Sequence, residues 1–361
     1  MRKTTILNKP LLTITFSTLL VACGGGGGGI PPQEANNENG SHLIRSITTV
    51  TKSTIGLKNA YNIALLNDDK TIIANSDPGL QFIDVHKSYD PSVLAEHKAK
   101  LGQFELSSDD STLYTGFYVV DISNVSKLNV LREVHDIDAW KLDPKHHKLY
   151  ALNPDFQHAH SLAILDTNKL KYGSPFKINH YPAVNRYVTK VDLDSISVVS
   201  KDEKTLYGLK SGEFRIVDIS QNQAITTYKK KLKYRMDNIT ISSDEASAFL
   251  IEPYGGGLKI IDIRKPEYVT LLNEINFEKG TYSVKLSPDN LKAYVTHQNG
   301  FYVVSLGIGG PFILREYTLE KYDALQELII SADGMTGYIL TEGYKVKDKT
   351  DNKLIIFTLM M

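Results

Sequence analysis

The chain has 361 residues, and its 41 Lys and Arg residues balance its 41 Asp and Glu residues. Because the composition gives no excess of positive charge, it does not support nucleic acid as a partner. Cys23 is the single cysteine, which excludes an internal disulfide. Apolar burial, drawn from the 42% of residues that are hydrophobic, must therefore stabilise the fold.

The first 22 residues have the layout of an export signal. A basic start at Arg2 and Lys3 precedes an apolar stretch, Leu11 to Val21, which is too short to span a membrane. The sequence Leu20 to Cys23 then resembles the lipobox of bacterial lipoproteins, in which the cysteine is lipidated and the preceding peptide is removed. The resemblance implies an exported protein with a covalent lipid (palmitate included) on Cys23. In a Gram-negative cell, Gly24 after the cysteine implies the outer membrane.

Residues 23–42 carry this anchor and link it to the rest of the chain. They contain six consecutive glycines, Gly24 to Gly29, followed by Pro31, Pro32 and mostly polar residues. Such a composition cannot bury a core, so we expect a flexible tether. A Gly-rich chain of this length spans about 25 Å on average, which would keep the following domain close to the membrane.

Residues 43–361 contain seven copies of one short apolar motif that usually ends in Asp. The copies are GLQFIDV (79–85), GFYVVDI (116–122), SLAILDT (161–167), EFRIVDI (213–219), GLKIIDI (257–263), GFYVVSL (300–306) and the degenerate LIIFTL (354–359). Their spacing averages about 45 residues, which is a propeller-blade period in a β-rich chain.

A second motif precedes each copy and places a polar turn between two apolar runs. Examples are LSSDDSTLY (106–114), ISSDEASAF (241–249) and LSPDNLKAY (286–294). Ser, Asp, Asn, Pro and Gly at this place indicate a tight turn. Each unit should therefore be a four-stranded antiparallel sheet, and the sequence predicts an all-β, seven-bladed β-propeller.

The two ends of the repeat array predict how the ring closes. The last unit stops after its third strand, whereas the segment 43–50 precedes the first unit and resembles the fourth strands at Val130 to Asp136 and Ile313 to Leu319. We therefore expect residues 43–50 to pair with Leu354 to Leu359 and complete the last blade, since an open ring would expose an unpaired edge.

The repeated aliphatic strand ending in Asp, as in Phe117 to Asp121 and Leu258 to Asp262, resembles the LVIVD repeat of bacterial and archaeal surface proteins. The resemblance covers residues 43–361, and Ser305 and Phe357 depart from it. It implies a β-propeller at the cell envelope. It implies no reaction and no catalytic residues.

Three further features have simple structural interpretations. The Asp residues of the motif (Asp84, Asp121, Asp166, Asp218 and Asp262) occur once per blade at a strand end, which indicates turn capping. Lys229 to Lys231 and Lys233 should lie on an exposed fourth strand, where Lys discourages edge pairing. No helix is expected after Gly255 to Gly257, so these glycines indicate a hairpin turn.

The longest connections predict a candidate binding face. They span 153–160, 179–194 and 341–353, and propeller topology brings all three to one face, where recognition is usually built. The candidate residues on this face are His158, His160, His180, Tyr181, Arg186, Asp192 and Asp194. His158 and His160 alternate along an extended chain and form a weak candidate metal site.

The first strand of each blade should line the central channel. Counting back from the turn Asp places Asn62, Gln103, Ala139, Ile196, Asn238, Ser283 and Glu327 at the channel mouth on the same face. Five of these seven residues are polar: Asn62, Gln103, Asn238, Ser283 and Glu327.

These features favour a non-enzymatic binding or scaffolding lipoprotein that recognises an envelope protein or a glycan, with no cofactor beyond the lipid. Two alternatives stay open. One is a metal-assisted hydrolase or lactonase with its site at the channel mouth, because propeller enzymes collect residues from several blades. The other is an outer-membrane assembly factor.

Overall fold

The computed structural model describes the following residues: 46–48, 51–58, 60, 62–76, 79–98, 101–115, 117–135, 139–153, 161–171, 173, 175–177, 184–189, 191–230, 238–252, 257–319, 324–342, 345–346 and 349–359. The contacts divide the chain into two units, Met1–His42 and Leu43–Met361. All described residues belong to the second unit. No helix among them is long and apolar enough to cross a membrane.

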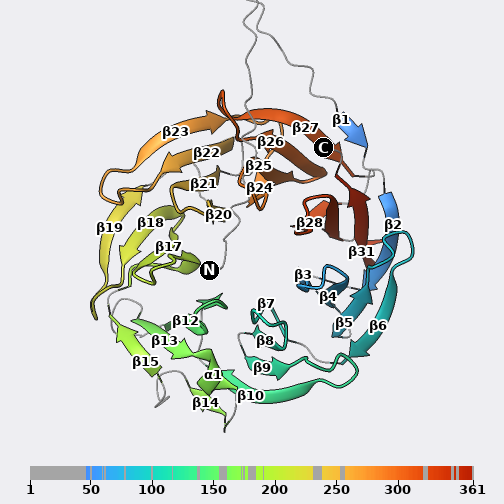
Figure 1. Ribbon diagram of the computed structural model, residues 1–361, viewed down its shortest axis with the longest axis horizontal. Helices are drawn as coiled ribbons and strands as arrows, with labels where there is room; N and C mark the ends of the chain where they lie inside the picture. The colour runs from blue at the N-terminus through green and yellow to red at the C-terminus, as the bar shows by residue number, and fades with distance from the viewer. Residues whose placement is uncertain are drawn as a thin grey trace, which may run out of the picture. The chain divides into compact units, whose positions relative to one another are not determined.

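The second unit is a ring of seven four-stranded antiparallel sheets around a central channel (Figure 1), which confirms the predicted propeller. Blade one comprises β3 (Asn62–Leu65), β4 (Thr71–Asn75), β5 (Leu80–Asp84) and β6 (Ser92–His97). Blade two comprises β7 (Phe104–Leu106), β8 (Thr112–Thr115), β9 (Tyr118–Asp121) and β10 (Asn129–His135). Blade three comprises β11 (Ala139–Asp143), β12 (Lys148–Asn153), β13 (Ser161–Asp166) and β15 (Val184–Val188), with helix α1 (Thr167–Leu170) after β13.

The remaining blades repeat this order from the channel outward. Blade four comprises β16 (Ser195–Val199), β17 (Thr205–Lys210), β18 (Glu213–Asp218) and β19 (Ile225–Lys230). Blade five comprises β20 (Asn238–Ile241), β21 (Ser247–Glu252), β22 (Gly257–Asp262) and β23 (Thr270–Ile275). Blade six comprises β24 (Thr281–Leu286), β25 (Lys292–His297), β26 (Gly300–Ser305) and β27 (Phe312–Thr318). Blade seven comprises β28 (Ala324–Ile330), β29 (Thr336–Glu342), β31 (Lys349–Thr358) and β2 (Thr51–Lys58), and β30 (Lys345–Val346) forms a short hairpin with β31.

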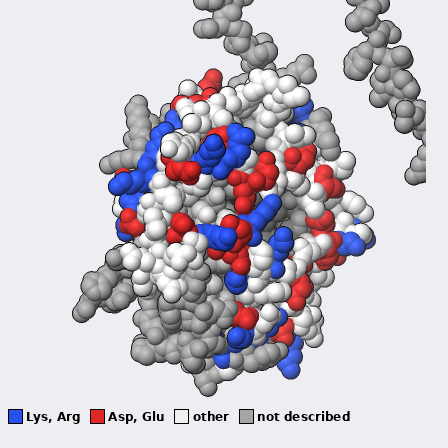
Figure 2. All heavy atoms as spheres, turned by 60° about the vertical axis from the view of Figure 1, so that its left-hand side comes forward, with Lys and Arg blue, Asp and Glu red and all other residues white. Residues whose placement is uncertain are grey.

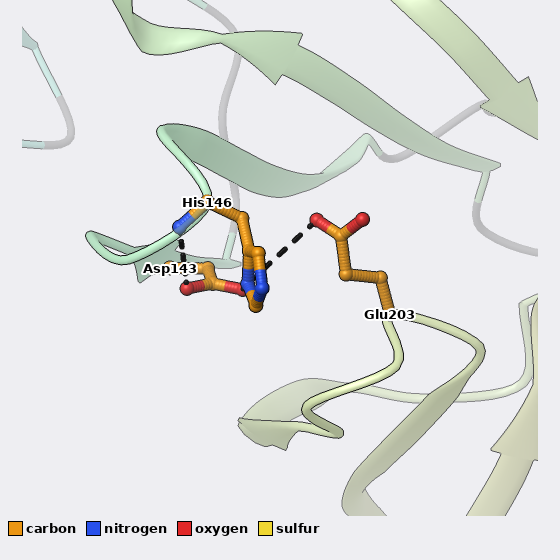
Figure 3. Close-up of side chains that lie close together, drawn as sticks. All are labelled: Asp143, His146 and Glu203. Atoms are coloured by element: carbon orange, nitrogen blue, oxygen red, sulfur yellow. Dashed lines mark hydrogen bonds and ion pairs between the residues drawn. The ribbon is translucent and has the colours of Figure 1, made fainter. Parts of the chain in front are cut away.

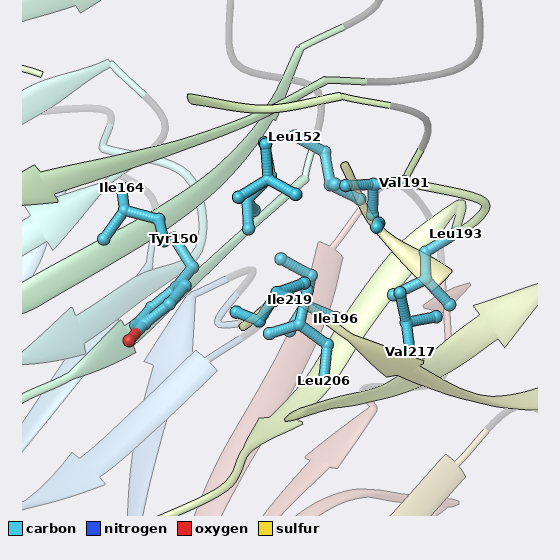
Figure 4. Packing of buried hydrophobic residues seen from close by; sticks show 12 residues of the cluster. Tyr150, Leu152, Ile164, Val191, Leu193, Ile196, Leu206, Val217 and Ile219 are labelled. Carbon is cyan, nitrogen blue, oxygen red and sulfur yellow. The ribbon is translucent and has the colours of Figure 1, made fainter. Parts of the chain in front are cut away.

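The core lies between the blades. Each hydrophobic cluster contains residues of two neighbouring blades, and the seven clusters correspond to the seven junctions of the ring. Figure 4 shows the junction of blades three and four, where Tyr150 and Leu152 face Ile196, Leu206 and Val217. Because every blade buries apolar side chains against both neighbours, the ring must close to leave no apolar face exposed.

The N-terminal part of the unit closes the ring, as predicted, but through a later segment. β2 pairs antiparallel with β31, in a register that joins Thr54 to Ile355 and Ile55 to Leu354. The prediction that residues 43–50 form this strand is wrong, because the part of them that is described, β1 (Ser46–Thr48), pairs parallel with β27 of blade six. Residues 51–58 have a weak strand pattern, because only Ile55 and Leu57 give the strand an apolar face. Leu57 is buried at the junction with blade one.

The Asp residues of the repeat cap turns, as predicted. The Oδ1 of Asp84, Asp121, Asp166, Asp218 and Asp262 each accepts a hydrogen bond from the backbone N–H two residues later, at 2.7 to 3.0 Å. Ser305 substitutes for Asp in blade six, and its Oγ accepts from the Gly307 N–H at 3.4 Å. A side-chain oxygen at this place satisfies the reversing backbone.

Two other structural predictions fall partly on described residues. Lys229 and Lys230 lie exposed on the outer strand β19, as expected, and Lys231 and Lys233 lie outside the described residues. Gly257 begins β22 with a φ of 80°, and an added Cβ would lie 2.1 Å from the Ile275 carbonyl oxygen. Gly255 and Gly256 lie outside the described residues.

Candidate functional site

The first strands of the blades surround a channel pocket of about 640 Å³. It is lined by residues from blades one, two, three, four, six and seven: Asn62, Ile63, Ala64, Gln103, Phe104, Glu105, Leu106, Trp140, Lys141, Ser195, Ile196, Lys285 and Glu327. Four of the residues predicted at the channel mouth, Asn62, Gln103, Ile196 and Glu327, are among them. The strand directions place the start of each first strand on the face that carries the connections between second and third strands. We call this face the loop face and the opposite one the turn face.

Polar side chains of the channel join neighbouring blades. The Glu327 carboxylate of blade seven accepts a hydrogen bond from the Ile63 N–H of blade one at 2.9 Å. Asn62 Oδ1 accepts from the Phe104 N–H of blade two at 3.4 Å. This polar ladder satisfies backbone donors of the innermost strands, which face the channel and not another sheet.

The same arrangement recurs at two further junctions. Glu105 of blade two accepts a hydrogen bond from the Leu142 N–H of blade three at 3.2 Å. Asn238 of blade five accepts from the Val284 N–H of blade six at 3.3 Å. Four of the channel residues therefore join neighbouring blades: Asn62, Glu105, Asn238 and Glu327.

The channel also holds charged groups that the sequence argument missed. Lys141 Nζ lies 2.8 Å from Glu105 Oε1, and Lys285 lies opposite these blades in the pocket lining. Burial raises the pKa of the Glu327 carboxyl, although the Ile63 N–H, the positive charge of Lys285 and the Asn62 amide all oppose this shift. Glu105, Lys141 and Lys285 each lie two residues after a predicted channel residue. Because alternate residues of a strand point to the same side, these three residues could have been predicted from the sequence as channel residues.

The other predicted channel residues have separate environments. Ser283 Oγ hydrogen-bonds to Thr296 Oγ1 within blade six, at 2.9 Å. Ile196 lines the pocket and also packs into the core between blades three and four. Ala139 pairs with Leu152 at the start of β11. These three residues contribute packing or hydrogen bonds within the protein.

On the loop face, the structure describes only part of the predicted binding residues. His158, His160, His180 and Tyr181 lie outside the described residues, so the weak metal site stays a prediction. Arg186 lies on β15, the outer strand of blade three, where it pairs with Ile164, and not on a connection as predicted.

Asp192 and Asp194 both contact the hairpin of blade four. Asp192 forms an ion pair with Arg215. Asp194 contacts Lys210 Nζ at 2.7 Å and accepts a hydrogen bond from the Ser211 N–H at 2.7 Å. The two carboxylates therefore order the approach of the chain into blade four.

The turn face carries the one group of described residues that could hold a metal ion. Asp143 and His146 lie in the first turn of blade three and face Glu203 in the first turn of blade four (Figure 3). One ligand atom from each residue lies within 4.8 Å of the others. In the sequence, LDPKHHKLY (142–150) is a weaker copy of the repeated turn, and no local pattern indicates that its Asp and His approach Glu203.

On the side shown in Figure 2, the described residues form no large field of one sign. Figure 2 shows Lys and Arg side chains intermingled with Asp and Glu on the side that it displays. This distribution agrees with the balanced composition and gives a nucleic acid no extended basic surface there.

Apolar and polar residues together line a groove between blades five and six that also opens towards the turn face. The groove has a volume of about 390 Å³, and its lining includes Phe249, Ile260 and Leu272 of blade five and Leu306 and Pro311 of blade six. Leu272 lines the groove and is 46% exposed. Three large apolar residues close to lining residues in the sequence are exposed too: Tyr268 by 74%, Leu271 by 48% and Ile308 by 109%. We call the groove with these four residues the blade five–six groove.

Comparisons with known proteins agree on the fold. No family model matches the chain, and no curated protein matches it. Among solved structures, a chain of the mitotic checkpoint complex is similar with a TM-score of 0.60 and 12% identity, over 87% of this chain and 96% of that one. The C-terminal WD40 domain of Sif2 is similar with a TM-score of 0.61 and 12% identity, over 87% of this chain and all of that one. These similarities support a seven-bladed β-propeller.

Proposed function

We propose that this protein is a binding or scaffolding lipoprotein of the bacterial cell envelope, anchored through a lipid on Cys23, whose propeller holds a partner protein in the blade five–six groove. The lipobox-like sequence and the LVIVD-like repeat support the location. The observation that carries the binding function is the groove itself. Leu272, which is 46% exposed, lies in its lining, and Tyr268, Leu271 and Ile308, close to lining residues in the sequence, are also exposed.

Exposed apolar side chains that gather at a groove are typical of a protein-binding surface. Leu272 supplies exposed apolar area in the lining, and Ile308 is exposed between the lining residues Gly307 and Gly310. A Cβ added at Gly310 would lie 3.9 Å from Asn273 Oδ1, so the backbone of blade six comes close to the outer strand β23 of blade five here.

The outer strands of the propeller already accept additional extended chain. β1 pairs with β27 in blade six, and β14 (Phe176–Lys177) pairs with β10 in blade two, both in parallel orientation. This pairing is the geometry by which a peptide adds to the edge of a sheet. β23, the outer strand beside the groove, is an edge of its sheet and is exposed over Thr270–Glu274. A partner segment could therefore add backbone hydrogen bonds to the apolar contact.

The channel supports an enzymatic function less well than the groove supports binding. Its carboxylates at Glu105 and Glu327 accept hydrogen bonds from the backbone of the next blade, and Glu105 is also paired with Lys141. Groups held in this way are suited to joining blades. One of the solved neighbours belongs to a protein complex, which agrees with a propeller used for assembly.

The repeat offers a matched pair of variants that tests the binding function. Leu272 is the bulge residue of β23, and Leu94 occupies the same place in β6 of blade one, where it is 50% exposed. We expect Leu272→Asp to abolish capture of a partner from detergent-solubilised envelopes, and Leu94→Asp to leave it unchanged. Equal capture by both variants would contradict the proposed groove.

The anchor is tested separately. Cys23→Ser should prevent lipid labelling and release the protein from the membrane fraction, because no other lipidation site is proposed. If the Cys23→Ser protein stays with membranes after a high-salt wash, the proposed anchor is wrong. Because this variant leaves the groove intact, it should still capture the partner in solution.

A further inference from the structure

The first turns of neighbouring blades are joined on the turn face by a repeated contact. In each turn one residue has a left-handed backbone, as at Asp69, Asp110, Glu245 and Asn290, with φ between 52° and 58°. At these four residues the side chain accepts a hydrogen bond from a backbone N–H in the turn of the preceding blade. The donors are Ala332, Asn67, Lys201 and Ser243, in the same order, at 2.6 to 3.4 Å.

Two junctions lack the backbone donor because a proline occupies its place. At the junction of blades six and seven the donor position is Pro288, and the acceptor position is Gly334, which has no side chain. Donor and acceptor are therefore absent together. At the junction of blades three and four the donor position is Pro144, yet the acceptor position retains a carboxylate, Glu203, with a φ of 59°. The repeated contact does not explain why Glu203 is there.

Glu203 instead faces side chains of blade three. Its Oε1 lies 3.9 Å from His146 Nδ1. The same His146 nitrogen lies 2.7 Å from Asp143 Oδ2. Asp143 occupies the place at which five other turns have a Ser that bonds to an Asp two residues later (Ser107, Ser200, Ser242, Ser287 and Ser331). Blade three thus departs from the repeated turn at the two residues that approach Glu203.

We propose that Asp143, His146 and Glu203 bind a Zn²⁺ ion that bridges blades three and four. Ligand atoms bound tetrahedrally to Zn²⁺ at about 2.0 to 2.1 Å lie about 3.3 Å from one another. The two His146 contacts, 2.7 and 3.9 Å, lie on either side of that value, so each of these two distances would change by about 0.6 Å on binding. The Asp143 and Glu203 oxygens, which lie within 4.8 Å of each other, would also have to reach it. One imidazole with two carboxylates suits Zn²⁺ better than Mg²⁺ or Ca²⁺, which prefer oxygen ligands alone.

The surroundings hold the ligands while leaving them accessible. The side chains of Asp143, His146 and Glu203 are 14%, 31% and 24% exposed. Lys148 Nζ lies 2.5 Å from Glu203 Oε2, which turns Oε1 towards His146. The Tyr150 hydroxyl donates to Glu203 Oε1 at 3.4 Å. His146 would bind through Nδ1 as the tautomer with its proton on Nε2, and the fourth position on the ion is left for water or for a donor from a partner.

The test uses the full chain with Cys23→Ser and without a histidine tag, so that neither a thiol nor a tag binds the ion. Isothermal titration with Zn²⁺ should show one saturable site, and Zn²⁺ should raise the melting temperature because it binds only the folded chain. Glu203→Gln and His146→Asn should each weaken binding by about tenfold or more. X-ray absorption of the Zn²⁺ form should show nitrogen and oxygen ligands and no sulfur.

The neighbouring residue supplies the control. His147 has a left-handed backbone, with a φ of 53°, which Asn tolerates, so His147→Asn should bind Zn²⁺ like the parent chain. Without metal, the melting temperatures of all variants show whether the fold is intact. No saturable binding by the parent chain would overturn the proposal. It would also be overturned if His146→Asn bound normally while replacement of His158 and His160 by Ala abolished binding, since the ion would then lie on the loop face.

Discussion

The carboxylate of Glu327 in blade seven accepts a hydrogen bond from the backbone N–H of Ile63 in blade one at 2.9 Å, although 264 residues separate them in the sequence. The same carboxylate lies 3.4 Å from the Asn62 amide nitrogen. The contact joins the two ends of the repeat array at the channel, while β2 joins them again inside blade seven. The ring is therefore closed by two components. The inner one is the contact of Glu327 with Ile63 at the channel, and the outer one is the pairing of β2 with β31.

The inner component predicts a difference between two variants of Glu327. Glu327→Ala removes the acceptor of the Ile63 N–H and should lower the free energy of unfolding by about 1 to 3 kcal/mol. Glu327→Gln keeps an acceptor oxygen and removes the cost of burying a charge, so at pH 7 it should be at least as stable as the parent chain. Urea denaturation of the three proteins measures this. A Gln variant as unstable as the Ala variant would show that the charge itself is needed.

The same carboxyl predicts a pH dependence. Burial raises the pKa of Glu327 in the folded chain, so the folded state binds a proton more readily than the unfolded state. Its contribution to stability is present below the unfolded pKa, about 4.3, and is lost as the pH rises through the raised folded pKa. The difference in unfolding free energy between Glu327→Gln and the parent chain should therefore grow with rising pH across this window. A constant difference would contradict the assignment.

The outer component predicts a disulfide. In the register of β2 and β31, Thr54 lies opposite Ile355 and Ile55 opposite Leu354, and opposed residues of antiparallel strands are within reach of a disulfide. In a Cys23→Ser chain, at least one of these pairs replaced by Cys should crosslink on oxidation and stabilise the fold by about 2 to 4 kcal/mol. A Cys pair at Ser46 and Ile356 serves as the control and should not crosslink, because Ser46 pairs with Glu316.

The buried histidine of blade six predicts loss of stability in acid. His297 is fully buried, its ring lies 4.8 Å from that of Tyr302, and its Nε2 lies 3.4 Å from Glu316 Oε1. Burial, and secondarily the positive charge of Lys279, lowers the pKa of His297 to about 4, against the opposing effect of Glu316. The unfolded chain takes up this proton first as the pH falls.

The stability that neutral His297 contributes should therefore be lost between about pH 6.5, its unfolded pKa, and about pH 4. The loss should be on the order of 3 kcal/mol. His297→Gln should flatten the dependence of unfolding free energy on pH in this window, whatever its effect at pH 7. His86→Gln changes an exposed histidine and serves as the control. Equal slopes for the two variants would contradict the prediction.

Repetition made the fold predictable from the sequence. Seven copies of an apolar strand, each preceded by a polar turn, predicted the blade number, the strand order and the turn-capping role of Asp84 and its equivalents. The closing strand was misplaced because Thr51–Lys58 contains few apolar residues, whereas residues 43–50 resemble other fourth strands. A strand that is paired on one side and exposed on the other has a weak apolar pattern.

The candidate sites were less predictable because they depend on contacts between blades. The channel residues Asn62 and Glu327 follow from repeat position, but their hydrogen bonds to the next blade require the ring to be built. The approach of Asp143 and His146 to Glu203 joins residues up to 60 positions apart. The blade five–six groove likewise joins β23 to a connection in blade six. Such pairs leave no local pattern in the sequence.

Photo-crosslinking on intact cells tests the proposed function most directly. A photoreactive amino acid is placed in the lipidated protein at Leu272, at Leu94 or at Asp192, and the products are identified by mass spectrometry. We predict that position 272 yields a specific crosslink to an envelope protein, whereas position 94 on blade one and position 192 on the loop face do not. Crosslinks from position 192 alone would place binding on the loop face, and no crosslink from position 272 would contradict the proposed function.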